Sequence, residues 1–229
     1  TWSSISGGLN YSLATKTDGT LWAWGRSDYG NLGLNDLVKR SSPTQIPGTT
    51  WRSVTGGGTG TQSSAATKTD GTLWTWGYND KGTLGQNNRT NYSSPIQVPG
   101  TSWSSLVDIG RAMIVATRTD GTLWSWGYNG YGQLGHNNGA GNPGNLSSPV
   151  QIPGTSWGTN QNFIKSGSYF TLARKTDNTL WSWGYGGNGA MAQNDRAHRS
   201  SPIQIPGTDW VSIQTVGGAA AAIKEDTTP

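Results

Sequence analysis

Thirteen tryptophans recur at regular positions along this chain of 229 residues, and their spacing constrains the fold more than any other feature. Eight form Trp-x-Trp pairs that are each followed by glycine, at Trp22/Trp24, Trp74/Trp76, Trp124/Trp126 and Trp181/Trp183, and five more stand singly at Trp2, Trp51, Trp103, Trp157 and Trp210. A period of about fifty residues is typical of propellers and solenoids, in which each unit buries its apolar surface against the next. We therefore predict a single repeat array with units 2–50, 51–102, 103–156 and 157–209 and a partial unit 210–229.

Each unit carries the pattern of four short strands, with a hairpin turn as its strongest local signal. The turn is Asp18-Gly19 in the first unit and recurs as Asp70-Gly71, Asp120-Gly121 and Asp177-Asn178. Because these residue types tolerate positive φ, we expect a two-residue type I′ turn that pairs Thr17 with Thr20. Strand alternation then puts the paired tryptophans on one face and Leu21 and Ala23 on the other. A sheet that is apolar on both faces fits a blade packed between two neighbours, where we expect the tryptophan pairs to be almost completely buried.

The ordered motifs Thr-Asp-Gly-Thr-Leu-Trp-x-Trp-Gly, Gly-x-Leu-Gly and Ser-Ser-Pro-x-Gln-Ile-Pro resemble the repeat of the regulator of chromosome condensation superfamily. The resemblance implies an all-β fold, a β-propeller with blades of four antiparallel strands, here four complete repeats plus a partial fifth. The fourth unit departs from the motif at residues 189–192, which read Gly-Ala-Met-Ala. Since residues 210–226 repeat residues 2–18, we expect the array to be part of a longer propeller, completed by further repeats or by another chain.

Composition excludes several kinds of site. The chain has no cysteine, so disulfides and thiolate metal sites are excluded. No segment approaches the roughly 20 apolar residues of a membrane span. The two histidines, His136 and His198, lie in different units, and the repeated aspartates occupy turns. We therefore predict no catalytic site, no cofactor and no bound metal. The net charge of +4 is spread through the units, which permits nucleic-acid binding without indicating it.

The loops between Gly-x-Leu-Gly and Ser-Ser-Pro, at 34–42, 86–94, 136–148 and 193–201, vary most in length. Variable loops on a rigid scaffold are the usual place for recognition. We therefore expect a non-catalytic protein-interaction scaffold whose loops lie on one face and bind a protein partner. The candidate partner-binding residues are Lys39, Arg40, Arg89, His136, Arg196, His198 and Arg199. The glycine-rich links at 56–63 and 160–168 are the competing candidate, expected on the opposite surface.

A carbohydrate-binding propeller is the alternative function. Its repeated sites would follow each Trp-x-Trp-Gly motif and consist of Tyr78, Asn79, Tyr128, Asn129 and Tyr185, which supply stacking and hydrogen bonds. The founding member of the superfamily is a guanine-nucleotide exchange factor, but its acidic and loop determinants find no match in this chain. The tryptophan- and asparagine-rich style resembles bacterial and bacteriophage members, which implies an extracellular or virion-surface location.

One repeated basic position also admits two interpretations. It is occupied by Lys16, Lys68, Arg118, Lys175 and Lys224, one in each unit. In a ring these residues would form a circle of like charge that binds an anion. Alternatively, each aliphatic stem covers the leucine on the neighbouring strand while its charged end reaches water or a backbone carbonyl, and we favour this interpretation.

Overall fold

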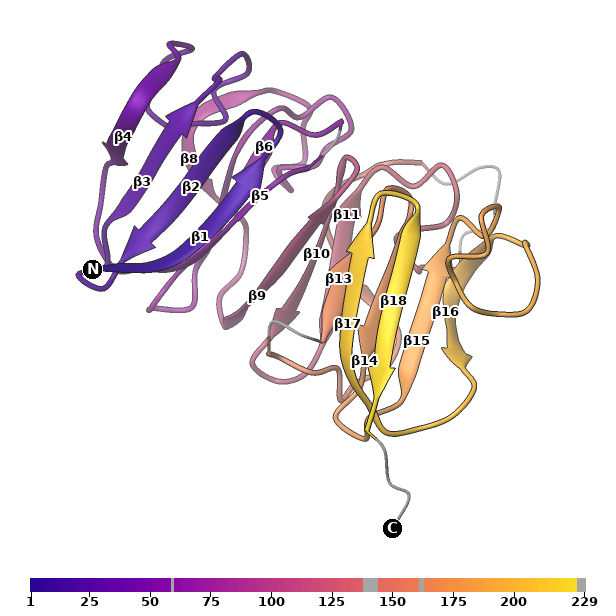
Figure 1. Cartoon of the computed structure of the whole chain (residues 1–229). Helices are drawn as coiled ribbons and strands as arrows, with labels where there is room; N and C mark the ends of the chain where they lie inside the picture. Colours follow the sequence, from indigo (N-terminus) through magenta and orange to yellow (C-terminus); the bar gives the residue numbers. More distant parts are fainter. Residues whose placement is uncertain (59, 138–143, 161–162, 226–229) are drawn as a thin grey trace.

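The computed structural model describes residues 1–58, 60–137, 144–160 and 163–225, and this part of the chain contains strands and no helix (Figure 1). The first blade contains β1 (Trp2–Gly8), β2 (Tyr11–Lys16), β3 (Leu21–Gly25) and β4 (Arg40–Ile46). The second contains β5 (Trp51–Gly56), β6 (Ser63–Lys68), β7 (Leu73–Gly77) and β8 (Tyr92–Gln97). The third contains β9 (Trp103–Gly110), β10 (Met113–Arg118), β11 (Leu123–Gly127) and β12 (Leu146–Ile152). The fourth contains β13 (Ile164–Ser166), β14 (Phe170–Arg174), β15 (Leu180–Gly184) and β16 (Arg199–Ile205), and β17 (Trp210–Val216) and β18 (Ala219–Lys224) follow.

Each complete blade is an antiparallel meander in which consecutive strands pair, and β17 and β18 form a two-stranded sheet equivalent to the first half of a blade. The predicted all-β fold, with four complete four-stranded repeats and a partial fifth, is confirmed. The first strands of successive blades lie together, β1 with β5, β5 with β9, β9 with β13 and β13 with β17. They therefore line the axis of an arc, while β4, β8, β12 and β16 form its outer edge. Figure 1 shows the blades following one another from indigo to yellow.

The hairpin turn between the second and third strands differs from the expected type. The Lys16 N–H donates to the Thr20 carbonyl at 2.9 Å, so the loop is the three residues 17–19. Gly19, its last residue, has a φ of 78°. A three-residue loop that ends in a left-handed residue makes a bulge beside the ladder, so the expected two-residue type I′ turn and its register are wrong. Asn178 takes the glycine position in the fourth unit with a φ of 63°, and the hairpin is retained there as predicted.

The aspartate of each turn holds the turn through its neighbours. In the third blade, Asp120 Oδ1 accepts hydrogen bonds from the Thr122 N–H at 2.9 Å and from the Thr122 hydroxyl at 2.7 Å. The Trp124 indole N–H in turn donates to the Thr122 Oγ1 at 2.9 Å. The same chain of contacts recurs in the other three blades. Because it lies at the end of the blade, Trp124 is only partly buried, and the expectation of nearly complete burial is wrong for the first tryptophan of each pair.

The second tryptophan of the later pairs packs between blades, as predicted. Trp76, Trp126 and Trp183 are fully buried, and their indole N–H groups donate to backbone carbonyls of the preceding blade, at Asn31, Thr83 and Gln133, over 2.8–2.9 Å. The Gly-x-Leu-Gly loop supplies the contact surface. Gly85 has a φ of 71°, and a β-carbon there would lie 2.9 Å from the Trp126 Nε1. The glycine is therefore required by both its backbone conformation and the tryptophan beside it.

The repeated basic side chains lie over tryptophan rings. We expected their aliphatic stems to cover the leucine on the neighbouring strand, and that is not their main contact. Lys68 Nζ is 4.6 Å from the ring centre of Trp51 and 4.3 Å from that of Trp74. The equivalent contacts, made by Lys16, Arg118, Lys175 and Lys224, span 4.0–5.0 Å. Cations at such distances are attracted by the ring quadrupole. This position therefore stabilises each blade, and a circle of free charges is not its arrangement.

The connections lie at two ends of the blades. The loop face carries the links between the first and second strands and the long loops between the third and fourth strands. The turn face carries the Asp-Gly hairpins and the Pro-Gly-Thr links between blades. Hydrogen bonds join the two kinds of loop-face segment, since the Tyr78 N–H donates to Gln62 O at 2.9 Å and the Tyr128 N–H donates to Ala112 O at 2.7 Å. The glycine-rich link 56–63 therefore shares a face with the long loops, and its expected place on the opposite surface is wrong. In the fourth unit, the range 160–168 includes strand β13, and residues 161 and 162 lie outside the described residues.

Candidate functional site

The loop face carries an excess of positive charge. The cations in its loops and links are Arg26, Lys39, Arg40, Lys81, Arg89, Arg111, Arg196 and Arg199, and the acids are Asp28, Asp36, Asp80 and Asp195. Every one of these acids is in an ion pair: Arg26–Asp28 at 2.5 Å, Arg40–Asp36 at 2.6 Å, Lys81–Asp80 at 3.0 Å and Arg199–Asp195 at 2.5 Å. Within the described residues, Lys39, Arg89, Arg111 and Arg196 are left without an ion pair. A face with four unpaired cations attracts an acidic partner.

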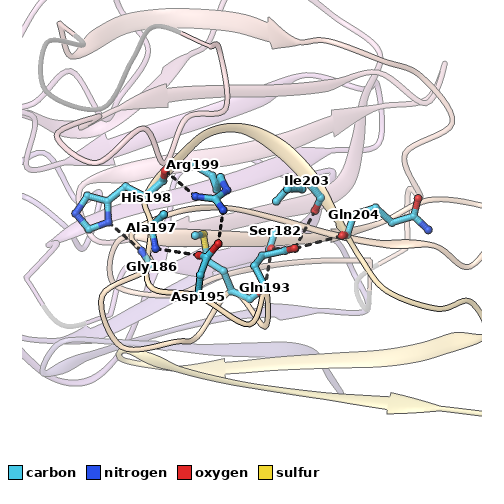
Figure 2. A network of polar contacts seen from close by, with 10 residues as sticks. Ser182, Gly186, Gln193, Asp195, Ala197, His198, Arg199, Ile203 and Gln204 are labelled. Atoms are coloured by element: carbon cyan, nitrogen blue, oxygen red, sulfur yellow. Dashed lines mark hydrogen bonds and ion pairs between the residues drawn. The ribbon is translucent and has the colours of Figure 1, made fainter.

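Two of the predicted partner-binding arginines form ion pairs with aspartates of their own loops. Figure 2 shows Arg199 directed at the Asp195 carboxylate, which also accepts a hydrogen bond from the Ala197 N–H at 2.9 Å. Arg40 and Asp36 repeat this arrangement in the first blade. The backbone hydrogen bond and the arginine hold the pKa of each aspartate below its usual value. These arginines therefore shape the loops, while Lys39, Arg89 and Arg196 are exposed and free to contact a partner.

The two predicted histidines make different contacts. His136 is partly buried and its Nε2 lies 2.9 Å from the Ser125 Oγ, and burial lowers the pKa of its imidazole. A lowered pKa keeps this ring neutral at pH 7. His198 is exposed, and its Nδ1 accepts a hydrogen bond from the Gly186 N–H at 3.2 Å (Figure 2). Residues 138–143 of the His136 loop lie outside the described residues.

A cluster of tyrosines fills the loop face between the third and fourth blades, and sequence reasoning missed half of it. We call Tyr128, Tyr131, Tyr169, Tyr185 and His198 the aromatic patch. The Tyr131 ring lies 5.0 Å from Tyr169, 4.9 Å from Tyr185 and 5.4 Å from His198, measured between centroids. All four tyrosines are partly exposed. Tyrosine and arginine are enriched at the energetic centres of protein interfaces, so the patch is a second candidate contact region.

The sequence signal for this patch is visible in retrospect. Tyr131 stands before Gly132, and Tyr29 holds the equivalent position before Gly30. The Tyr29 ring lies tilted against Tyr78 of the next blade, 4.4 Å between centroids, and Tyr131 packs edge-on against Tyr185 of the next blade at 4.9 Å. The tyrosine in this position therefore contacts the tyrosine that follows the Trp-x-Trp-Gly motif of the next blade.

The asparagines proposed for carbohydrate binding are buried within their own loops. Asn79 Oδ1 accepts from the Leu84 N–H at 2.8 Å, and its Nδ2 donates to the carbonyls of Asn88 and Thr90 at 3.2 and 2.9 Å. Asn129 Oδ1 accepts from the Leu134 N–H at 3.0 Å. Tyr78, Tyr128 and Tyr185 remain partly exposed. The structure therefore brings the tyrosines to the surface and leaves these asparagines to fix the loops.

The described part of the chain contains neither a cluster of metal ligands nor a membrane-spanning helix. Across residues 1–58, 60–137, 144–160 and 163–225, no three histidine or acidic side chains come together as a metal site would require. Within the same ranges, the structure contains no helix with the length and apolar character of a membrane span.

Comparison with known proteins adds to this geometry. A family model described as "Regulator of chromosome condensation (RCC1) repeat" matches residues 18–66, 70–116 and 120–173, and a second model of the same description matches residues 2–31 and 162–190. Two Arabidopsis thaliana proteins are similar over 93% of this chain and 48% of their own length: "Ultraviolet-B receptor UVR8", at 29% identity, and "RCC1 domain-containing protein RUG3, mitochondrial", at 30%. The chain thus spans about half the length of these relatives. The solved structure of yeast RCC1 (Prp20) bound to Kap60 superposes with a TM-score of 0.82 at 18% identity, over 99% of this chain and 55% of that one.

Proposed function

Because this chain belongs to the regulator of chromosome condensation repeat family, we propose that it is a non-catalytic propeller scaffold that binds an acidic protein partner through its loop face. The observation that carries the proposal is the charge balance of that face. Each of its four described acids is neutralised by a neighbouring cation, whereas Lys39, Arg89, Arg111 and Arg196 have no ion pair among the described residues. The yeast structural neighbour, which was solved with Kap60 bound, supports protein binding as the activity of such a fold.

The unpaired cations serve association more than scaffold stability. Lys39, Arg89 and Arg196 are exposed at the tips of loops that internal hydrogen bonds already fix. Charges of this kind speed the encounter with a partner of opposite sign and lose that effect as salt screens them, over about 8 Å at physiological ionic strength. The aromatic patch lies on the same face and supplies apolar area for the bound state.

A capture experiment with charge variants tests this function. The full chain is immobilised, and the amount of acidic protein partner that it captures is measured. The same amount is measured for the triple variant Lys39→Gln, Arg89→Gln and Arg196→Gln. The matched control is Lys39→Arg, Arg89→Lys and Arg196→Lys, which keeps the charge. We expect the neutral variant to lose capture and the control to keep it, with equal melting temperatures. Unchanged capture by the neutral variant would refute the loop-face proposal.

Carbohydrate binding is the second candidate, and partly exposed Tyr78, Tyr128 and Tyr185 favour it. The enclosed amides of Asn79 and Asn129 weaken it, because a sugar site needs polar groups beside its stacking ring. A glycan array separates the two functions, since repeated weak binding of one sugar class supports only the second. A location outside the cell or on a virion stays a prediction from the style of the sequence, and so does completion of the propeller by further blades.

A further inference from the structure

One of the unpaired cations, Arg111, is exposed but also contacts residues of two neighbouring blades. It lies in the link between β9 and β10, and its guanidinium carbon is 5.0 Å from the ring centre of Tyr169 in the fourth blade. On another side it packs against Gly60 of the second blade, where a β-carbon would lie 2.9 Å from the Arg111 Nε. Among the described residues its guanidinium has no hydrogen bond and no ion pair. Three blades thus position a cation whose donors are unused.

Arg111 lines a cavity of about 170 Å³ at the loop-face end of the propeller axis. The walls come from the ends of the first strands and the adjoining links of four units, among them Gly58, Ile109, Ser166, Ser168 and Thr215. Arg111 is the one charged residue in this lining. Ser166 lies beside the Asp108 carboxylate, to which its backbone N–H donates at 2.5 Å, and its hydroxyl is buried. The Arg111 guanidinium is therefore the charged group of this lining that is open to a ligand.

The size of the cavity limits what it holds. Sites for drug-sized ligands and cofactors occupy about 300–1,000 Å³, which exceeds this cavity. At about 30 Å³ for each water molecule in the liquid, the cavity has room for roughly six waters. A small polar group at the end of a side chain therefore fits, and a whole nucleotide does not.

We propose that this cavity receives a single carboxylate from an acidic segment of the partner, bound by the Arg111 guanidinium. The inference rests on the proposed function and identifies Arg111 as the residue that makes partner binding specific. The ring of Tyr169 covers one face of the guanidinium, which leaves the edge with its N–H donors for a bidentate pair with a carboxylate. The aromatic patch begins at Tyr169, so the segment that carries the carboxylate would continue across it.

The charge of the cavity favours a carboxylate over a phosphate group. A phosphate carries nearly two negative charges at pH 7, whereas a carboxylate carries one. The cavity lining offers one cation, and the links that form it already use several backbone N–H groups internally, as when the Gly167 N–H donates to Phe170 O at 2.9 Å and the Ser168 N–H to Gly217 O at 2.7 Å. One guanidinium matches a singly charged group.

Binding of a fluorescein-labelled octaglutamate peptide to the full chain, followed by fluorescence anisotropy, tests the inference. At about 0.15 M salt, where screening acts over about 8 Å, we expect Arg111→Gln to weaken binding about tenfold to a hundredfold, the effect of losing hydrogen bonds to a charged group. Arg111→Lys keeps the charge without the bidentate geometry and should fall between this variant and the wild type. Arg89→Gln is the comparison, because it removes an equal charge from the same face; as an exposed cation of the proposed contact region it should weaken binding only about twofold, well short of the loss for Arg111→Gln.

The possible results separate this inference from the proposed function. Equal losses for Arg111→Gln and Arg89→Gln would show diffuse attraction and overturn the carboxylate site while leaving the loop-face function standing. Failure of the peptide to bind the wild-type chain would contradict both. Competition on the wild-type chain gives an answer independent of any variant's folding: displacement by acetate supports the site, and displacement by inorganic phosphate with none by acetate would overturn the assignment to a carboxylate.

Discussion

Substitution of Gly85 by alanine tests how the blades are joined. A non-glycine residue in the left-handed conformation that Gly85 adopts costs about 1–2 kcal/mol. The new β-carbon would also lie 2.9 Å from the Trp126 Nε1, which donates to Thr83 O at 2.8 Å. Displacing that indole leaves a buried N–H unpaired, at a further cost of about 1–3 kcal/mol. We therefore expect Gly85→Ala to lower the free energy of unfolding by about 2–5 kcal/mol.

Gly189 provides the matched control, since its φ is 72° but a β-carbon there meets nothing within 4 Å. Gly189→Ala should cost about 1–2 kcal/mol, the conformational part alone. Ala192 takes the position of Gly85 in the fourth unit and has a φ of 52°, so alanine can adopt this conformation. The sheet that follows it has two strands and contains no Trp-x-Trp pair. Urea unfolding of both variants gives the free energies, and Gly85→Ala in a Trp126→Phe background should cost no more than Gly189→Ala. Equal costs for the two glycine substitutions in the wild-type background would refute the role assigned to the indole contact.

Three further predictions concern the scaffold. Trp126→Ala should lower the free energy of unfolding by about 3–5 kcal/mol, as for other large buried aromatics. Trp124→Ala should lower it less, because Trp124 is partly exposed. A thermal unfolding experiment that ranks the two variants in the reverse order would contradict the packing of Trp126 between blades. Hydrogen bonds from the Thr122 hydroxyl and N–H lower the pKa of Asp120 below 3.8, so its contribution to stability is present above that pH and is lost as the pH falls through the lower folded value. Asp120→Asn keeps the acceptor oxygen, and its melting temperature should therefore fall less steeply on acidification than that of the wild type; parallel curves would contradict this. Calcium or a chelator should leave the melting temperature unchanged, because the turn aspartates lie one to a blade, and a shift of several degrees would reveal a bound ion.

The repeat pattern was sufficient to predict the fold because the residues that define it are local. The Trp-x-Trp pair, the Asp-Gly turn and the alternation of Leu21 and Ala23 each specify a strand or a hairpin within a few positions. The turn register was mispredicted because Asp18-Gly19 suits both a two-residue loop and the end of a three-residue loop. Nothing in the two residues themselves distinguishes these, and the Thr20 hydrogen bonds to Asp18 favour the longer loop.

The candidate site was only partly predictable because it depends on contacts between blades. The pairs Asp36–Arg40 and Asp195–Arg199 are four residues apart and were open to detection from spacing alone. Tyr131 and Tyr169 come from different units and neither position is occupied by tyrosine in every repeat, so periodicity did not mark them. Arg111 lies in a short link whose importance comes from Tyr169 and Gly60, residues of two other blades.

The indole-to-carbonyl bonds between blades give the array a direction. The second and third blades each offer a tryptophan N–H on one side and a carbonyl acceptor on the other, as Trp126 and Gln133 do in the third blade. Such a head-to-tail contact is complementary to itself, so a duplicated unit would find a fitting surface on both of its neighbours without any compensating substitution. Arrays of this kind can lengthen by copying a segment of about fifty residues, and their units remain interchangeable wherever this donor and acceptor are kept.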